Sequence, residues 1–142
     1  MNKITKFLKK SFMKPVISLP KSFSDSRGFI QPICDFDTKN ISLIYSGKNT
    51  WRANHYHKRD WHFIYVLDGS FEYYYRKTHA NTKVIKKIIT GGQLLFTGPM
   101  VDHAMFYLTE TNIIVASKNP RDQKTYEKDT VRIDFMNNDR RF

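Results

Sequence analysis

Residues 51–77 read WRANHYHKRDWHFIYVLDGSFEYYYRK, and this stretch decides the class of fold. It contains two runs, WHFIYVL and SFEYYYRK, which are rich in β-branched and aromatic residues and are separated by a turn-forming Asp-Gly. From Phe71 to Arg76 every second side chain faces the same side of an extended chain. The stretch therefore predicts two consecutive strands, each with one buried face and one face that is solvated or lines a site.

Similar runs continue on both sides of this stretch. The candidate strands lie at 29–36, 41–46, 61–67, 70–77, 83–90, 93–97, 101–108, 112–118 and 130–135. Turn-forming pieces such as SGKN, THANT and KNPRD separate them at the even spacing of an all-β sandwich or barrel. No helical stretch of ordinary length competes, so we expect an all-β fold.

One compact domain accounts for the length and the composition. The 142 residues suit one domain of roughly 100 to 200 residues, and 40% of them are hydrophobic. We expect a basic N-terminal segment at 1–24 and a single domain at 25–142. In the N-terminal segment Ile4, Phe7 and Leu8 lie near helical spacing between lysines, so a membrane-surface helix is one interpretation. A basic arm or a first strand is the interpretation that we favour.

Charge and cysteine content restrict the partners and the compartment. The 24 Lys and Arg against 13 Asp and Glu give a formal charge of +11, which favours an anionic partner. The lysines spread along the chain and form no stripe on a known docking element, so we expect no nucleic-acid binding. Cys34 is the lone cysteine, and no apolar run reaches the roughly 18 residues that span a bilayer. We therefore expect a cytoplasmic protein without a membrane span.

Histidines form the pattern that points to a site. His55 and His57 lie two residues apart, His62 follows, and His103 lies on another predicted strand. On an extended chain, positions i and i+2 face the same side about 7 Å apart. His55 and His57 can therefore reach into one cavity.

These residues resemble the two sequence motifs of the cupin superfamily. The residues that match the motifs are Gly47, His55, His57, His62, Gly69, Pro99 and His103. A glutamate is usual in cupins at the position of His62. The resemblance implies a double-stranded β-helix, the cupin jelly roll, with its site inside the barrel.

A finer resemblance is to the nucleotide-sugar branch of the cupins, the dTDP-4-dehydrorhamnose 3,5-epimerases and the dTDP-sugar 3,4-ketoisomerases. The segments that carry it are DSRGF at 25–29, RANHYHK at 52–58, PMVDHAMF at 99–106 and YEKDTV at 126–131. The resemblance implies an isomerase or epimerase that acts on a dTDP-4-keto-6-deoxyhexose, in surface polysaccharide or deoxysugar biosynthesis. Ala53, Met100 and Ala104 stand where the families have glycine.

Histidine chemistry suits such a reaction. The base that removes a proton beside a sugar ketone needs a pKa near neutrality, and histidine has one of about 6.5. We expect His55 to be this base, with His57, Arg52 or Lys58 stabilising the enediolate. The second acid is His57 or a tyrosine. The run NIIVASK lacks the catalytic tyrosine of the epimerases, which leaves Tyr107 as its stand-in.

The basic residues supply candidates for binding the nucleotide sugar. The predicted substrate-binding residues are Arg27, Phe29, Arg52, Lys58, Arg76 and His103. Guanidinium groups bind phosphate oxygens bidentately, which makes Arg27, Arg52 and Arg76 candidates for the diphosphate. Phe29 or the tyrosines at 73–75 are candidates to stack on the nucleobase. The resembled families form dimers that swap N-terminal strands, so the resemblance implies a homodimer in which Arg27 acts across the subunit boundary.

Two other functions remain open. His55, His57, His62 and His103 would also suit one divalent metal ion, as in a metal-dependent cupin dioxygenase or lyase. Metal-binding cupins usually add a carboxylate, so we expect no cofactor. The other alternative is a non-catalytic sugar-binding cupin.

Overall fold

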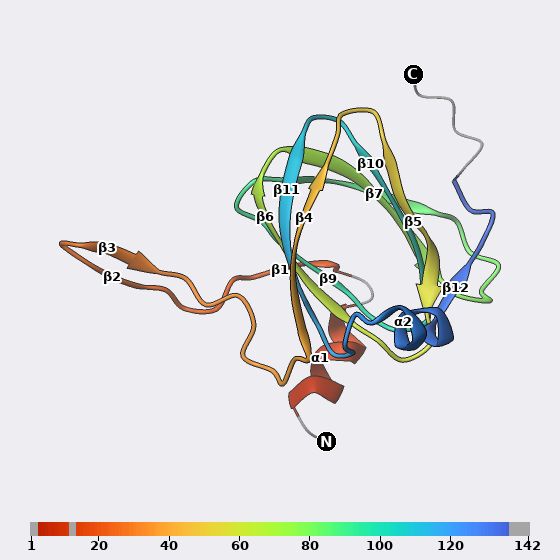
Figure 1. Cartoon of the computed structure of the whole chain (residues 1–142), viewed down its shortest axis with the longest axis horizontal. Coiled ribbons are helices and arrows are strands. Elements are labelled where there is room, and N and C mark those ends of the chain that lie inside the picture. The colour runs from red at the N-terminus through yellow and green to blue at the C-terminus, as the bar shows by residue number, and fades with distance from the viewer. Residues whose placement is uncertain (1–2, 12–13, 137–142) are drawn as a thin grey trace.

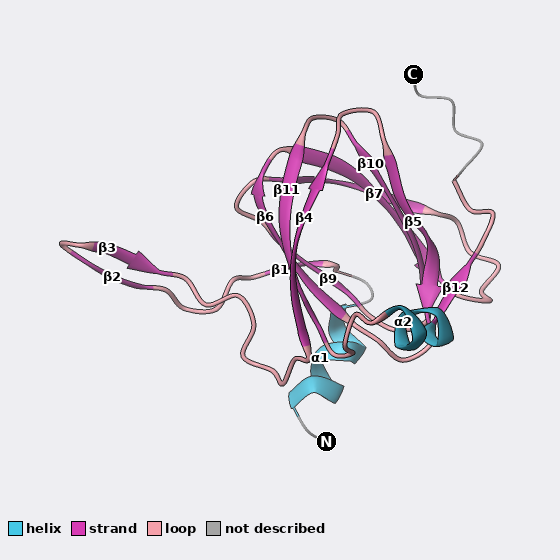
Figure 2. Ribbon diagram, viewed as in Figure 1, coloured by secondary structure: helices cyan, strands magenta, loops and turns pink. Residues whose placement is uncertain are grey.

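The computed structural model describes residues 3–11 and 14–136. Its helices are α1 (Lys3–Ser11) and α2 (Gln123–Asp129). Its strands are β1 (Val16–Ile17), β2 (Phe23–Asp25), β3 (Gly28–Ile30), β4 (Asn40–Ser46), β5 (Trp51–His57), β6 (His62–Asp68), β7 (Ser70–Lys77), β8 (Ile85–Thr90), β9 (Leu94–Thr97), β10 (Val101–Tyr107), β11 (Thr111–Ser117) and β12 (Thr130–Arg132). Figure 2 shows that strands dominate the chain, which confirms the all-β prediction.

Two antiparallel sheets face each other and form the barrel of Figure 1. One 5-stranded sheet has the order β1-β9-β6-β11-β4, and the other has the order β12-β5-β10-β7-β8. Large apolar and aromatic side chains from both sheets, among them Val66, Phe71 and Val115, fill part of the interior between them. This architecture confirms the predicted jelly roll. None of the helices in the described residues is long and apolar enough to cross a membrane.

The predicted strands agree with the structure except where apolar and polar residues do not alternate along the chain. The runs predicted from residue 41 onward coincide with strands to within a few residues, whereas the run at 29–36 is a strand only as far as Ile30. Strand β5 was not among the predicted runs. Its inward side carries His55 and His57, because it lines the candidate site, so it lacks the apolar periodicity on which strand prediction depends.

The N-terminal residues 3–11 form a helix, which corrects the arm-or-strand interpretation. Ile4, Phe7 and Leu8 pack on the outer face of the first sheet, where the ring of Phe7 lies 4.5 Å from that of Phe96. The apolar side of the helix therefore packs against the barrel and is not free to bind a membrane surface. Strand β1 then pairs with β9 and extends the same sheet.

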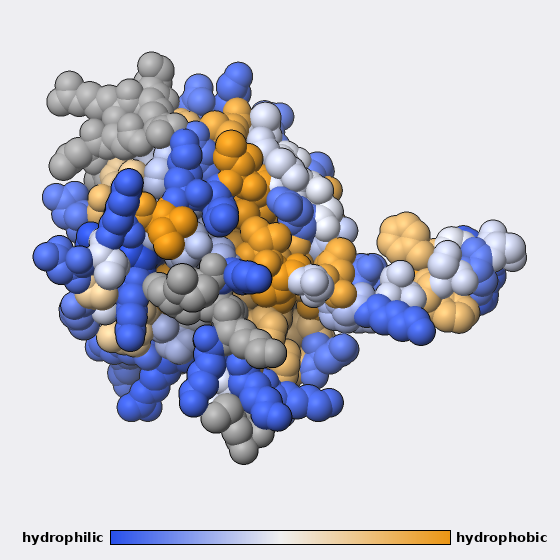
Figure 3. Space-filling model, turned by 180° about the vertical axis from the view of Figure 1, so that it is seen from behind, coloured by the Kyte–Doolittle hydropathy of each residue, from blue (hydrophilic) through white to orange (hydrophobic). Residues whose placement is uncertain are grey.

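The hairpin formed by β2 and β3 stands clear of the barrel (Figures 1 and 3). Its side chains Phe23, Phe29 and Ile30 are 58%, 75% and 67% exposed. At its turn, Arg27 forms an ion pair of 2.6 Å with Asp25. The hairpin thus presents apolar side chains to solvent at a distance from the rest of the chain.

Candidate active site

The four histidines of the predicted cluster meet inside the barrel. His55 and His57 come from β5, His103 from the adjacent β10, and His62 from β6 in the opposite sheet. The ring centroid of His55 lies 4.7 Å from that of His57 and 4.8 Å from that of His103. The ring centroids of His57 and His62 are also 4.7 Å apart. Imidazoles that are far apart in the sequence therefore form one cluster.

A bulge in β5 re-aims the strand just before its two histidines. Ala53 and Asn54 have φ angles of 67° and 57°, and the pairing of β5 with β10 shifts register here. A bulge of this kind bends a strand and redirects the side chains that follow it. The families' glycine at position 53 suits this left-handed backbone, which an alanine adopts at a cost of about 1–2 kcal/mol.

Hydrogen bonds orient three of the rings. His103 Nδ1 donates to the carbonyl two residues earlier in β10 over 2.9 Å, and His62 Nε2 bonds to Asp60 Oδ2 over 2.9 Å. His57 Nδ1 lies 3.4 Å from Asp129 Oδ2. In the described part of the chain, the buried Nε2 of His57 has no hydrogen-bond partner. This nitrogen is therefore a candidate ligand atom for an ion held within the cluster.

Burial keeps three of the clustered imidazoles neutral. Burial, together with the positive charges of neighbouring histidines and arginines, lowers the pKa of His55 to about 2. Burial likewise lowers the pKa of His57 far below its usual range. Burial also lowers the pKa of His103 to about 4, against the opposing effect of its backbone hydrogen bond. At neutral pH His55, His57 and His103 thus offer unprotonated nitrogens, the form that a general base or a metal ligand requires.

Arginines surround the mouth of the cavity next to this cluster. The cavity has a volume of about 290 Å³, and its lining includes Arg52, Arg121, Arg132 and Tyr126. Arg52 Nε donates to the hydroxyl of Ser46 over 2.6 Å, which fixes its guanidinium against the end of β4. The guanidinium of Arg121 lies 5.5 Å from the ring centroid of Tyr126. The cavity therefore combines neutral imidazoles with cations that would attract a diphosphate.

Sequence reasoning missed Arg121, Arg132 and Tyr126. Tyr126 lies on α2, and its ring centroid is 6.3 Å from that of His55 and 5.9 Å from that of His57. The signal that would have found α2 is its N-cap, because the side chain of Asp122 accepts a hydrogen bond from the backbone of Thr125. Polar capping residues in a short loop mark the start of a helix even without apolar periodicity.

Two of the predicted binding residues lie outside this cavity. Arg76 lies on the outer face of β7, where its Nε donates to Asp102 Oδ2 over 3.0 Å and its guanidinium lies over Phe135. Lys58 follows the end of β5, and its Nζ donates to the backbone carbonyl of Lys128 over 3.2 Å. Strand alternation explains why Arg76 points outward, because the inward positions of β7 are occupied by tyrosines. The structure therefore does not place either side chain where it would bind a diphosphate in this cavity.

Tyr107, the predicted stand-in for the catalytic tyrosine, lines the cavity at a distance from the cluster. It lies four residues beyond His103 on β10, which corresponds to about 13 Å along a strand. Its side chain is fully buried, its hydroxyl donates to the sulfur of Met105, and burial raises its pKa. Its hydroxyl is therefore a poor partner for a proton transfer at His55.

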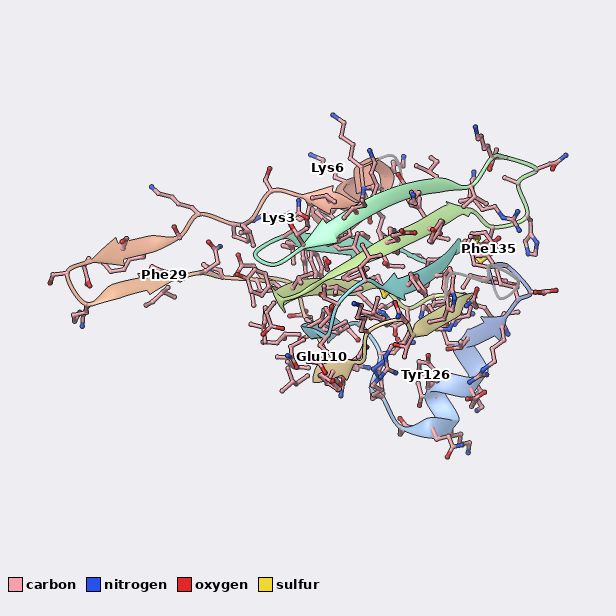
Figure 4. The ribbon with its side chains drawn as sticks, turned by 90° about the horizontal axis from the view of Figure 1, so that it is seen from above. Lys3, Lys6, Phe29, Glu110, Tyr126 and Phe135 are labelled. Atoms are coloured by element: carbon pink, nitrogen blue, oxygen red, sulfur yellow. The ribbon has the colours of Figure 1, made fainter. Side chains whose placement is uncertain are left out.

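Arg27 and Phe29 do not reach the cavity of their own chain. Both lie on the projecting hairpin, and Figure 4 shows Phe29 at the opposite end of the molecule from Tyr126. If they contribute to a site, that site belongs to another copy of the chain. This placement agrees with the role across a subunit boundary that the resemblance implied for Arg27.

The residues of the cluster fit a divalent metal ion. Ligand atoms of His55, His57 and His103 all lie within 4.8 Å of one another, and so do those of His57, Asp60 and His62. Nitrogen donors of this kind suit zinc, iron, nickel or copper. The unpartnered Nε2 of His57 is consistent with such a ligand role. The expectation that the chain has no cofactor stays a prediction.

Known proteins with this architecture act on nucleotide sugars. The sugar 3,4-ketoisomerase QdtA of Thermoanaerobacterium thermosaccharolyticum, solved with TDP, superposes with a TM-score of 0.66 and is 24% identical, over 85% of this chain and 90% of that chain. The chain has the fold of the nucleotide-sugar cupins. The TDP-fucose-3,4-ketoisomerase of Campylobacter jejuni matches with a TM-score of 0.65 and 18% identity, over 78% of this chain and 83% of its own.

The epimerases of this branch are similar to the chain as well. The dTDP-4-dehydrorhamnose 3,5-epimerase of Sulfolobus tokodaii matches with a TM-score of 0.64 and 19% identity, over 81% of this chain and 74% of that chain. No protein-family model matches the chain, and no curated protein matches it. The fold therefore confirms the resemblance that the sequence motifs indicated, and both reaction types occur on it.

Proposed function

We propose that this chain is a nucleotide-sugar isomerase or epimerase that acts on a dTDP-4-keto-6-deoxyhexose by histidine general acid/base catalysis, in surface polysaccharide or deoxysugar biosynthesis. The observation that supports it best is the cavity in which neutral imidazoles adjoin three guanidinium groups. A neutral imidazole can accept a carbon-bound proton, and the cations can hold an anionic substrate in place. The structural neighbours include sugar 3,4-ketoisomerases and a dTDP-4-dehydrorhamnose 3,5-epimerase.

His55 is the general base in this proposal. It lines the cavity, and the rings of His57 and His103 both lie within 5 Å of its own. Removal of the proton on C3 produces an enediolate, whose negative charge the cations at the mouth stabilise. Arg121 has no carboxylate partner within the described residues, whereas Arg132 pairs with Glu127. Arg121 is therefore the cation that we expect to contact the diphosphate.

A homodimer is part of the proposal, because Arg27 and Phe29 need a second copy to act. The hairpin exposes Phe23, Phe29 and Ile30, and the edge strand β4 exposes a second apolar row with Leu43 at 68%. Exposed apolar rows and an unpaired strand edge favour association. Together they support an assembly in which the hairpin of one copy contacts the barrel of another.

The experiment that tests the function is solvent exchange. The full chain is incubated in deuterated water with TDP-4-keto-6-deoxyglucose, and deuterium at C3 is followed by NMR and mass spectrometry. We expect incorporation with the wild-type chain and a loss of about 10²–10⁴-fold with His55→Asn. The matched control is His79→Asn, which changes an exposed histidine in a turn at φ 60°, a backbone that asparagine tolerates. Binding of TDP without exchange would instead indicate a non-catalytic sugar-binding cupin.

A metal-dependent enzyme is the second candidate, and the unpartnered Nε2 of His57 favours it. Elemental analysis of the protein purified without chelator would find about one ion per chain if this candidate is right. Addition of Zn²⁺ would then raise the melting temperature of the wild-type chain but not that of His57→Ala. If the exchange reaction proceeds at the same rate in EDTA, the metal is not part of the proposed reaction.

A further inference from the structure

Tyr126 lies where a hydroxyl can act together with the histidine cluster. Its ring is 6.3 Å from that of His55 and 5.9 Å from that of His57, in edge-on arrangements of 79° and 67°. Among the described residues, the tyrosines that line the cavity are Tyr107 and Tyr126. Figure 4 shows Tyr126 where α2 approaches the barrel.

The contacts of α2 hold this tyrosine in place. At the end of the helix, the carboxylate of Asp129 accepts hydrogen bonds from the backbone of Arg59 over 2.8 Å and from that of Asp60 over 3.1 Å. The backbone of Lys58 donates to the carbonyl of Asp129 over 2.9 Å. Strand β12 follows directly and pairs with β5. The helix is thus clamped to the strand that carries His55, which fixes the separation of the two rings.

The distance between the rings of His55 and Tyr126 decides whether the substrate lies between these two groups or to one side of both. A sugar ring between two flanking groups needs about 7–8 Å, because each side requires a van der Waals contact of about 3.5–4.0 Å. The separation of 6.3 Å between the rings of His55 and Tyr126 leaves no such slot. The substrate must therefore present one face to both groups. A reaction that inverts C3 needs proton donor and acceptor on opposite faces, which this pair does not provide.

We propose that Tyr126 is the oxygen-side acid and base of a one-face 3,4-ketoisomerisation in which His55 transfers the carbon-bound proton; the proposal rests on the function proposed above. His55 takes the proton from C3, and the C–H electron pair forms the C3=C4 bond. The C4 carbonyl electrons move to O4, which takes the phenolic proton of Tyr126. The phenolate then takes the proton of O3, whose O–H electrons form the C3 carbonyl.

Protonation of C4 completes the reaction. The C3=C4 electron pair takes the proton from His55, so that C4 carries a hydrogen and a hydroxyl group. His55 and Tyr126 both return to their starting protonation states, and the ketone has moved from C4 to C3. The guanidinium group of Arg132, whose charge interacts with His55 and Tyr126, would face the negative charge that forms on O4, while Arg121 binds the diphosphate.

Rival tyrosines are less suitably placed. Tyr107 lies about 13 Å along β10 from His103. Tyr73 is fully buried, and its hydroxyl is hydrogen-bonded to Thr97 over 3.0 Å. The hydroxyl of Tyr107 donates to the sulfur of Met105. The missing tyrosine of the epimerase motif is thus replaced in space by one from the C-terminal helix.

The test is Tyr126→Phe in the full chain, with TDP-4-keto-6-deoxyglucose in deuterated water. We expect formation of the 3-keto product to fall by about 10²–10⁴-fold, the usual contribution of a general acid or base. Deuterium exchange at C3 should fall by less, because the guanidinium of Arg132 can still stabilise the charge on O4 while His55 removes and returns the carbon-bound proton. Movement of the ketone additionally requires transfer of the proton of O3, for which Tyr126 is the proposed group. A merely structural role would lower exchange and product formation equally.

The control is Tyr56→Phe, which changes a tyrosine on the opposite face of β5, where its ring contacts His79. We expect both rates to stay within about twofold of wild type. The role of Tyr126 is wrong if Tyr126→Phe forms product at the wild-type rate, if exchange and product formation fall together, if Tyr107→Phe alone abolishes product, or if the product is inverted at C3. Absence of both exchange and 3-keto product with the wild-type chain would instead refute the proposed function, and the role of Tyr126 with it.

Discussion

Replacement of Asp129 by alanine should destabilise the protein more than any other change to α2. Its buried carboxylate accepts hydrogen bonds from the backbone N–H groups of Arg59 and Asp60, and it faces the ring of His57 at 3.4 Å. A hydrogen bond to a charged group contributes about 1.5–3 kcal/mol. The N–H of Arg59 is partly exposed and can rehydrate, whereas that of Asp60 is buried. We therefore expect the free energy of unfolding to fall by about 3–5 kcal/mol.

Urea unfolding followed by circular dichroism measures this change. With a slope of about 2 kcal/mol/M, the midpoint should fall by about 1.5–2.5 M. Asp122→Ala, which removes the N-cap of the same helix, should cost about 1 kcal/mol. Asp37→Ala, an exposed carboxylate, should change stability by less than about 0.5 kcal/mol. If Asp129→Ala shifts the midpoint no further than Asp37→Ala, α2 is not held to β5 by this carboxylate.

Three further outcomes are expected. Ala53→Gly should raise the free energy of unfolding by about 0.5–1 kcal/mol, because glycine relieves the left-handed backbone but gains entropy in the unfolded chain; thermal melting checks this. The folded-state pKa values of His55, His57 and His103 lie below the unfolded value of about 6.5, so stability should be fully present above pH 6.5. As the pH is lowered below 6.5, the free energy of unfolding should decrease by up to about 1.4 kcal/mol per pH unit for each neutral imidazole. Urea titrations from pH 7 to 4.5 measure this slope, and the absence of a slope would show that the imidazoles are protonated in the folded state. Leu43→Lys should convert the proposed dimer to a monomer in light scattering, and a monomeric wild-type chain would contradict the dimer.

Much of the fold and part of the site followed from local patterns. Alternating aromatic and β-branched residues from Phe71 onward identified their strand, because every second side chain must be buried for a sheet to form. The i, i+2 spacing of His55 and His57 placed both rings on one face by the geometry of a strand alone. The same reasoning failed in β5 for strand prediction, since a strand that lines a polar site carries polar residues on its inward face.

The predicted site residues that the structure places away from the histidine cluster are those whose position depends on distant neighbours. Arg76 and Lys58 have the right chemistry for a diphosphate, but strand alternation and the end of β5 direct them to Asp102 and to the carbonyl of Lys128. Tyr107 has the right side chain, but its position along β10 separates it from the cluster. Composition and motif spacing contain no information on these separations.

The sequence by itself determined the strand periodicity and the shared face of His55 and His57, because these depend on near neighbours along the chain, while the resemblance to the cupin motifs added the jelly-roll class and the other two histidines of the cluster. Only the tertiary structure decided which arginines and which tyrosine share the cavity with His55, because Arg121 just before α2 and Tyr126 within it lie more than 60 residues along the chain from His55. Contacts of that range depend on how β12 pairs with β5 and on the carboxylate of Asp129 that clamps α2. That arrangement places the proton-transfer groups on one side of the substrate, for which motif spacing provides no evidence.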